Sequence, residues 1–209
     1  FSSVGPTDVE FRVKPDVVAP GGNVLSSVPG GDWAFYSGTS MASPHLAGMA
    51  AVVLAAHMDE TGKSWAAWQV RSAIINTADT EAVWQTLDAE EYETNVLKVG
   101  SGLAQLDSAV NAKLVLSQPS ISFGAVPSGS GRSITKTIEV TNVSGGPIEF
   151  TPEATGAEVT LGKLAGAPMF SVVPSEVELE DGKAATISGT FEAPNSRGYA
   201  CAQAHLELG

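Results

Sequence analysis

The run Gly38-Thr39-Ser40-Met41-Ala42-Ser43-Pro44-His45 decides how the first half of this chain folds. It lies between a short apolar stretch at 33–37 and a long apolar segment, which we expect to form a helix over about 40–57. This order places Ser40 at a helix N-terminus, where free backbone N–H groups and the helix dipole favour a developing negative charge. A serine in such a position is a candidate nucleophile for acyl transfer.

A serine nucleophile needs a base, and the three histidines of the chain include no good candidate. His45 is five residues beyond Ser40 on the same predicted helix, so it points about 140° away, and we expect it to pack. His57 ends that helix and is expected to be a dipole partner or a surface group. His205 lies in a predicted strand and is expected to be packed or on the surface. The aspartates near Ser40 in sequence have no histidine partner in any motif: Asp8, Asp16 and Asp32.

The composition is that of a soluble globular protein of 209 residues, 43% hydrophobic and 16% charged, enough for one large or two smaller domains. A net charge of −12 argues against nucleic-acid binding. No stretch approaches the length of a membrane span, although 46–56 is strongly apolar. Cys201 is the only cysteine, which excludes an internal disulfide, and its apolar neighbours predict a buried strand position.

The periodicity changes near Ser117-Gln118-Pro119, which predicts two domains, 1–116 and 117–209. The first contains helical patterns and short strands. Its helices are expected at 40–57, 65–77 and about 106–116, and its short strands at 16–19, 23–27 and 33–37.

The predicted helix at 40–57 is apolar on almost every side, so it must be buried all round. The other elements of 1–116 are too few to enclose it, and we expect its cover to come from residues outside this chain. The segment at 78–99 is acidic and is predicted to be a solvated surface excursion. Its carboxylates lack the spacing of a calcium loop.

The second half alternates with period two between turn signals and predicts an antiparallel β-sandwich of immunoglobulin or fibronectin type. The chain ends at Gly209 near the end of a strand, which leaves room for a missing final strand. The sequon Asn142-Val143-Ser144 is interpreted as a chance occurrence in a turn. The strands are expected at 120–123, 134–140, 148–150, 159–161, 170–173, 177–179, 185–191 and 199–208.

The run at 38–45 resembles the nucleophile motif of the subtilisin-like serine proteases. The resemblance continues in the order of that family, through segments before and after the run, and covers about the first 115 residues. A weaker resemblance links 122–124 and 137–143 to the fibronectin-like domain that follows the catalytic domain in many larger subtilases. The segments that extend the stronger resemblance are 1–6, 14–21, 73–78 and 100–110.

The resemblance implies that 1–116 is the C-terminal portion of a parallel-sheet α/β peptidase domain, followed by an all-β domain. It assigns the nucleophile role to Ser40, whose own backbone N–H would be an oxyanion donor. Gly38 and Thr39 would shape the approach, and Pro44 would sit early in the helix, where a missing N–H is tolerated. Met41 and Ala42 complete the motif. The triad aspartate and histidine, and the asparagine that donates to the oxyanion, are expected upstream of Phe1.

This reading predicts part of a secreted or surface-bound serine endopeptidase that acts on polypeptides and is inactive as the chain stands. No cofactor is identified, although the resemblance leaves room for structural calcium in the longer protein. The expected partner is the upstream part of the same domain. A degenerate protease that only binds peptides or serves as a scaffold remains the alternative. A third hypothesis, compatible with the first, gives 118–209 a binding or spacer role.

Overall fold

The computed structural model describes residues 1–87, 90–93, 95–127, 129–163, 169–195 and 199–209. It divides into two compact units, which we describe separately. The helical unit comprises Phe1–Pro6 and Val13–Ala112, and the β unit comprises Thr7–Arg12 and Lys113–Gly209. The elements of the helical unit are β1 (Val24–Val28), β2 (Asp32–Tyr36), α1 (Thr39–Ala56), α2 (Ala67–Asn76), β3 (Trp84–Leu87), β4 (Glu90–Glu93), α3 (Val96–Val99) and α4 (Leu106–Val110).

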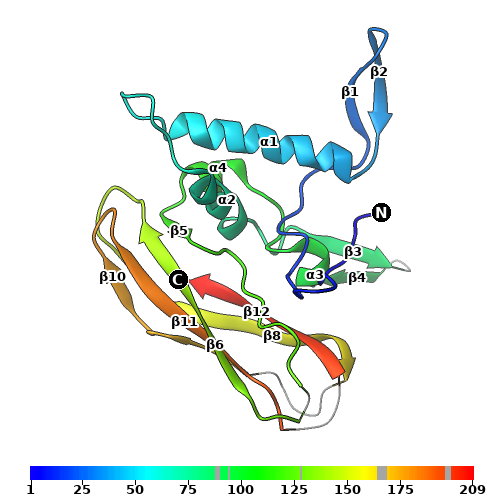
Figure 1. Cartoon of the computed structure of the whole chain (residues 1–209). Helices are drawn as coiled ribbons and strands as arrows, with labels where there is room; N and C mark the ends of the chain where they lie inside the picture. Colours follow the sequence, from blue (N-terminus) through cyan, green and yellow to red (C-terminus); the bar gives the residue numbers. More distant parts are fainter. Residues whose placement is uncertain (88–89, 94, 128, 164–168, 196–198) are drawn as a thin grey trace. The chain divides into compact units, whose positions relative to one another are not determined.

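The helical unit is built around α1, which contacts α2 and α4 (Figure 1). Apolar side chains from these helices and from the segment before α4 form the core: Val53, Val70, Ile74, Ala104 and Ala109. Val70 and Ile74 are four residues apart and so share one face of α2, and the removal of these side chains from water stabilises the packing of the helices.

The helix predicted at 40–57 is confirmed, but its burial all round is not observed in the described part of this chain. Val53 is its one buried residue, while Val52 is 46% and Leu54 36% exposed. By length and mean hydropathy, 1.3, α1 would also pass as a membrane span, and one such helix is weak evidence for a span. One side of α1 packs against α2 and α4, and the rest of the helix is not covered by the described residues.

The sheet content of the helical unit differs from the expectation of a parallel sheet. Its named strands form two antiparallel hairpins, β1–β2 and β3–β4. The strand expected at 16–19 is reduced to one parallel bridge between Val18 and Leu103. Within the described residues, this bridge is all that represents a parallel sheet. The acidic excursion at 78–99 contains β3, β4 and the short helix α3, and its side chains at 84–94 lie outside what the structure describes.

The helix predicted at about 106–116 is wrong in its second half. α4 ends at Val110, and Leu114–Leu116 is strand β5 of the β unit, where Leu114 pairs with Asn142. An apolar run of this length fits either element, and pairing with a neighbouring strand decides the outcome. The strand expected at 120–123 is also wrong, because those residues form an irregular segment.

The described strands of the β unit all pair antiparallel. A four-stranded sheet has the order β5-β6-β11-β9, and two further pairs are β10–β7 and β12–β8. Seven of the eight predicted strands are confirmed. Those at 148–150, 177–179 and 199–208 have the predicted bounds, three others have shifted ends, and 159–161 lies inside the longer β8. The bounds are β5 (Leu114–Leu116), β6 (Ser133–Asn142), β7 (Ile148–Phe150), β8 (Pro152–Lys163), β9 (Met169–Val173), β10 (Val177–Leu179), β11 (Ala184–Glu192) and β12 (Tyr199–Leu208).

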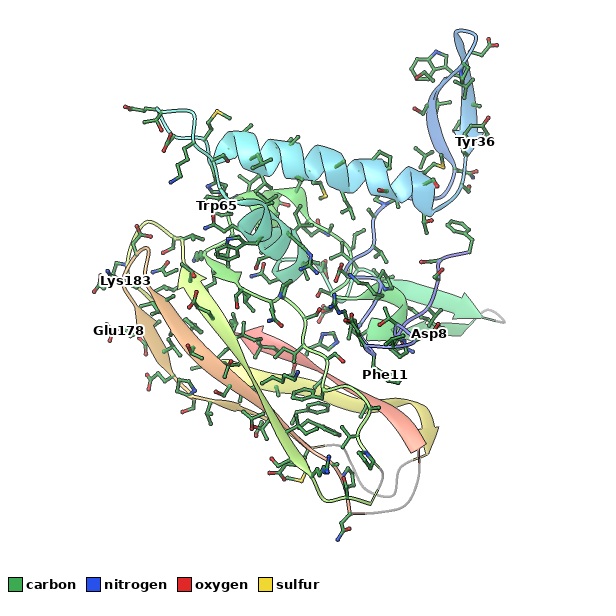
Figure 2. All side chains as sticks on the ribbon, viewed as in Figure 1. Asp8, Phe11, Tyr36, Trp65, Glu178 and Lys183 are labelled. Carbon is green, nitrogen blue, oxygen red and sulfur yellow. The ribbon has the colours of Figure 1, made fainter. Side chains whose placement is uncertain are left out.

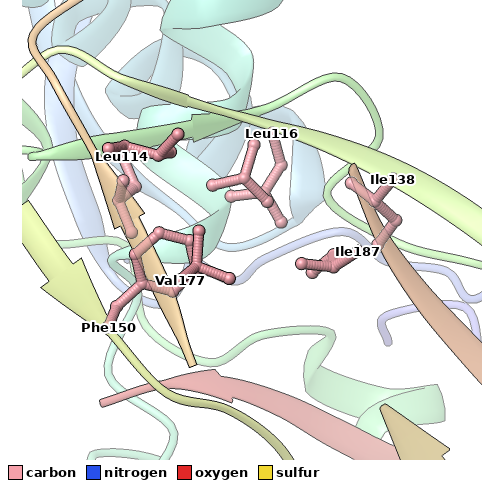
Figure 3. Packing of buried hydrophobic residues seen from close by; sticks show 8 residues of the cluster. Leu114, Leu116, Ile138, Phe150, Val177 and Ile187 are labelled. Carbon is pink, nitrogen blue, oxygen red and sulfur yellow. The ribbon is translucent and has the colours of Figure 1, made fainter. Parts of the chain in front are cut away.

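The core of the β unit is a cluster of aliphatic side chains around Phe150 (Figure 3). They come from alternate positions of β5, β6, β7, β10 and β11, as expected when one face of each strand is buried. The cluster consists of Leu114, Leu116, Ile138, Val140, Phe150, Val177, Leu179 and Ile187. Cys201 lies in β12, but its side chain is outside the described residues.

Candidate active site

Ser40 is the second residue of α1, and its side chain is exposed. The N-cap residue, Gly38, provides no side-chain cap, and the first turn contains no acidic residue. The N–H groups of Thr39 and Ser40 therefore lie in the part of the helix where no intrahelical acceptor exists. A negative charge beside Ser40 would meet these donors and the positive end of the dipole.

The turn before Ser40 is held by the hairpin β1–β2, whose base closes through two hydrogen bonds. The Gly38 N–H donates to the Gly21 carbonyl at 2.7 Å. The Asn23 N–H donates to Ser37 Oγ at 2.8 Å. Gly21 is needed here because a Cβ atom on it would lie 2.8 Å from the Gly38 oxygen. Ser40 is thus positioned by backbone contacts rather than by a cap side chain.

The hairpin itself carries an exposed apolar face. Its register pairs Leu25 with Phe35 and Ser27 with Trp33, so these four residues share one face. Leu25, Phe35 and Trp33 are 52%, 64% and 69% exposed. Tyr36, on the opposite face, is labelled in Figure 2 and is 54% exposed.

The other residues of the motif are placed around the first two turns of α1. Met41 and Ala42 are half-buried, and their N–H groups donate to the Gly38 carbonyl at 3.0 and 3.4 Å. Thr39 is exposed. Pro44 was expected early in the helix, but it is the sixth helical residue, beyond the first turn. The Ser40 carbonyl therefore lacks the usual i→i−4 donor.

Neither histidine of the helical unit is aimed at Ser40. His45 is exposed, and its Nδ1 donates to the Met41 carbonyl at 2.8 Å, so the expectation that it packs is wrong. His57 is the C-cap of α1, about 25 Å along the helix from Ser40. His57 Nε2 donates to the Val110 carbonyl at 2.8 Å, and its ring stacks on Trp65. It is a half-buried packing group, which the sequence reading missed.

Of the three aspartates considered with Ser40, Asp16 forms ion pairs. Asp16 accepts hydrogen bonds from Lys14 Nζ and, at 3.2 Å, from Arg71 Nη2. This carboxylate therefore joins the segment before the hairpin to α2. Asp32 begins β2 opposite Val28. Asp8 belongs to the β unit, and so does His205, which is half-buried in β12 opposite Thr155.

The glycine turn Gly100-Ser101-Gly102 packs against the same segment. The Ser101 N–H donates to the Asp16 carbonyl at 2.9 Å. Gly100 has a φ of +62°, and a Cβ atom there would lie 2.1 Å from the Asp16 oxygen. At Gly102, with a φ of +103°, it would lie 2.1 Å from the Asp79 oxygen. Only glycine fits this close approach of two backbones.

Two carboxyl groups outside the 38–45 run have shifted pKa values. A hydrogen bond from Thr61 and another from the Lys63 N–H lower the pKa of Asp59, in the turn that follows α1. The pKa of Glu149 in the β unit is raised by a hydrogen bond and the charge of Glu176. Among the described residues, no three His, Cys, Asp or Glu side chains gather in a way that could hold a metal ion.

Residues 1–102 match the sequence model of the subtilase family of peptidases. The match lies in the first half of the chain, which contains helices and small antiparallel sheets, and the exposed Ser40 lies inside it.

Known proteases are similar to parts of this chain. The minor extracellular protease Vpr of Bacillus subtilis is 37% identical over 130 residues, which are 59% of this chain and 15% of Vpr. Subtilisin E of Bacillus subtilis is 46% identical over 94 residues, 45% of this chain and 20% of that protein. Subtilisin-like protease SBT1.5 of Arabidopsis thaliana is 33% identical over 132 residues, 55% of this chain and 16% of that protein. The chain therefore spans about a fifth or less of the length of these relatives.

Proposed function

We propose that this chain is the part of a subtilisin-like serine endopeptidase that carries the nucleophile, Ser40. The observation that supports this most directly is the exposed position of Ser40 at the uncapped N-terminus of α1, within the segment that matches the subtilase family. Ser40 Oγ would attack the peptide carbonyl, and the proton would pass to a histidine base. The oxyanion would accept a hydrogen bond from the Ser40 N–H at the positive end of the helix dipole.

We place the remaining catalytic groups in the longer protein, outside this chain. His45 and His57 each donate to a backbone carbonyl, and Asp16 is paired with Lys14 and Arg71. The triad aspartate and histidine and the oxyanion asparagine would come from upstream sequence. The same upstream sequence would cover the exposed side of α1. The isolated chain is then expected to be inactive, because loss of a single triad residue already costs about 10⁴- to 10⁶-fold in kcat.

We assign residues 1–116 to the peptidase domain and 117–209 to a fibronectin-III-like sandwich. The antiparallel strands and the aliphatic core of the β unit support the second assignment. The relatives include a protease described as extracellular, which supports action outside the cell on polypeptides. Acyl transfer by this machinery needs no cofactor, and structural calcium is left to the longer protein.

A fluorophosphonate probe tests the nucleophile, because it reacts with an activated serine hydroxyl. The probe is applied to the longer protein, freed of any inhibitory propeptide, and to the 209-residue chain, and labelling is located by mass. We expect labelling of the longer protein at Ser40 and none of the isolated chain. Ser40→Ala must abolish the label, while Ser43→Ala, an exposed serine of the same motif, must keep it.

Two outcomes would overturn parts of the proposal. Labelling of the isolated chain at Ser40 would place a working base inside it. A folded longer protein that takes up no label would instead indicate a degenerate protease that binds peptides or serves as a scaffold.

A further inference from the structure

We infer that Thr7–Arg12 is a strap that the β unit binds through the turn Ser122-Phe123-Gly124. These six residues pack with the β unit, although Phe1–Pro6 before them and Val13–Ala112 after them form the helical unit. The chain therefore passes between the units after residues 6, 12 and 112. The strap, Thr7–Arg12, lies within residues 1–102, the segment that matches the subtilase family.

The contact is made by the Ser122 hydroxyl. Ser122 Oγ lies 3.0 Å from the Glu10 carbonyl oxygen and 2.8 Å from that of Phe11. A hydroxyl has one proton, so the two carbonyls share it, while its lone pairs remain free to accept. One of these accepts the Gly124 N–H at 3.1 Å. The hydroxyl thus donates to the strap and accepts a hydrogen bond from its own turn.

The residues on both sides of Ser122 are anchored in the β unit. The Phe123 ring lies 6.1 Å from that of Phe170 and 5.7 Å from that of Phe191, measured between centroids. Phe170 and Phe191 are a cross-strand pair of β9 and β11. Ile121 packs against the aliphatic core. Because its neighbours are fixed in this way, the Ser122 hydroxyl is held in place before the strap binds.

The strap has a shape that presents its carbonyls. The Thr7 N–H donates to the Arg12 carbonyl, and the Phe11 N–H donates to the Thr7 carbonyl, both at 3.1 Å. The Arg12 N–H donates to Thr7 Oγ1 at 3.0 Å. This closed loop, in which Figure 2 labels Asp8 and Phe11, leaves the Glu10 and Phe11 carbonyls to an outside donor.

Each residue of the turn Ser122-Phe123-Gly124 then has a role. Ser122 binds the strap, Phe123 anchors the turn, and Gly124 adopts a φ of +72°, which favours glycine. The Ser122 side chain then contacts the strap and not the face of a sheet, which agrees with the irregular backbone at 120–123. The β unit is then a binding module for a loop of the peptidase segment and not only a spacer.

Trypsin cleavage of the full 209-residue chain tests the strap. Arg12–Val13 is the one bond before Lys63 that trypsin can cut, because the other basic residue there, Lys14, precedes Pro15. The cut removes residues 1–12 and is followed by intact mass. We expect Ser122→Ala to accelerate it about fivefold, the effect of losing one hydrogen bond.

Three further variants separate docking from general destabilisation. Ser120→Ala, an exposed serine on the same segment, and Ser122→Thr, which keeps the hydroxyl, must cut at the wild-type rate. If Ser122→Ala disturbs the amide protection of β6 and β11, the nearly isosteric Ser122→Cys replaces it and must also cut faster than wild type. A wild-type rate in the variant that lacks the hydroxyl, or equal acceleration in Ser122→Thr, would overturn the inference.

Discussion

The imidazole of His57 stacks on the indole of Trp65, with ring centroids 3.5 Å apart and planes inclined by 10°. Because His57 also donates to the Val110 carbonyl at 2.8 Å, one side chain joins the end of α1 to the segment before α2 and to the end of α4. Trp65 in turn packs against the core of the helical unit, and Figure 2 shows it near the C-terminal end of α1. The His57 side chain therefore links α1, α4 and the segment before α2 at the C-terminal end of α1, the end far from Ser40.

We expect His57→Ala to destabilise the helical unit by about 1–2 kcal/mol, because it removes both the stack and the hydrogen bond. The measurement is the urea midpoint, followed by amide exchange of α1 and α2 so that the β unit does not interfere. His45→Ala is the matched control on the same helix. The His45 ring is exposed and forms its hydrogen bond within its own helix. The free energy of unfolding of this variant should therefore stay within about 0.5 kcal/mol of wild type. Equal effects of the two variants would contradict this role for His57.

Gly100→Ala tests the close approach of the glycine turn to the segment before the hairpin. The added Cβ atom would lie 2.1 Å from the Asp16 oxygen, so the turn and the segment must separate. Strain at a positive φ adds to this clash, and we expect a loss of more than about 2 kcal/mol.

Gly62→Ala is the control for the strain alone. Gly62 also has a positive φ, +78°, but an added Cβ atom would meet nothing within 4 Å. Its loss should be about 1 kcal/mol. The free energies of unfolding of both variants are compared in urea. If Gly100→Ala is as stable as Gly62→Ala, the two backbones can move apart freely.

Much of the fold is predictable from the sequence where a pattern is long and regular. The apolar run that becomes α1 and the alternating strands β6, β11 and β12 are examples. The errors fall where tertiary contacts decide. The apolar run at Leu114–Leu116 suggests the continuation of a helix, but these residues pair with β6. The helix α3 has four residues, which are too few to form a recognisable pattern.

The candidate site divides in the same way. The eight-residue run at 38–45 identifies Ser40 and predicts its place at a helix start, because the helix follows directly in sequence. The partners of Asp16 and His57 could not be predicted, since Arg71 and Val110 are 55 and 53 residues away along the chain. Contacts at such separations leave no local periodicity.

Glu149→Gln tests the pH dependence of the β unit. Glu149 pairs with Glu178 across β7 and β10, and a hydrogen bond and the charge of Glu176 raise its pKa above the ordinary 4.5. The folded state then holds a proton that the unfolded state releases. The free energy of unfolding therefore falls as the pH rises from the ordinary value through the raised one.

The neutral amide should remove this fall and stabilise the β unit at about pH 7, where the wild-type side chains repel one another. The measurement is the urea midpoint of the β unit between about pH 4 and pH 8. Glu139→Gln, an exposed glutamate on β6, should leave the wild-type pH dependence in place. If Glu149→Gln retains the full pH dependence of the urea midpoint, Glu149 is not the group that causes it.

Asn142, the asparagine of the sequon, is fully buried at the end of β6. Its Nδ2 donates to the Gly146 carbonyl at 2.8 Å and to the Leu179 carbonyl at 2.9 Å, and its Oδ1 accepts the Ser144 N–H at 2.9 Å. Both amide protons are therefore used, and a glycan on Nδ2 would replace one of them and break at least one of the two bonds that Nδ2 donates. The interpretation of the sequon as a turn agrees with this geometry, and the side chain is what closes the turn.

We expect Asn142→Asp to destabilise the β unit by about 2–4 kcal/mol, because a buried carboxylate would face two carbonyl oxygens without a donor. Asn195→Asp, on an exposed loop, should change the urea midpoint little, and amide exchange of β6 and β11 reports which unit has been affected. Expression of the chain through a eukaryotic secretory pathway gives an independent measurement by intact mass. We expect folded chain without a glycan at Asn142, and a stable, folded, glycosylated product would show that the buried amide is not required to close the turn.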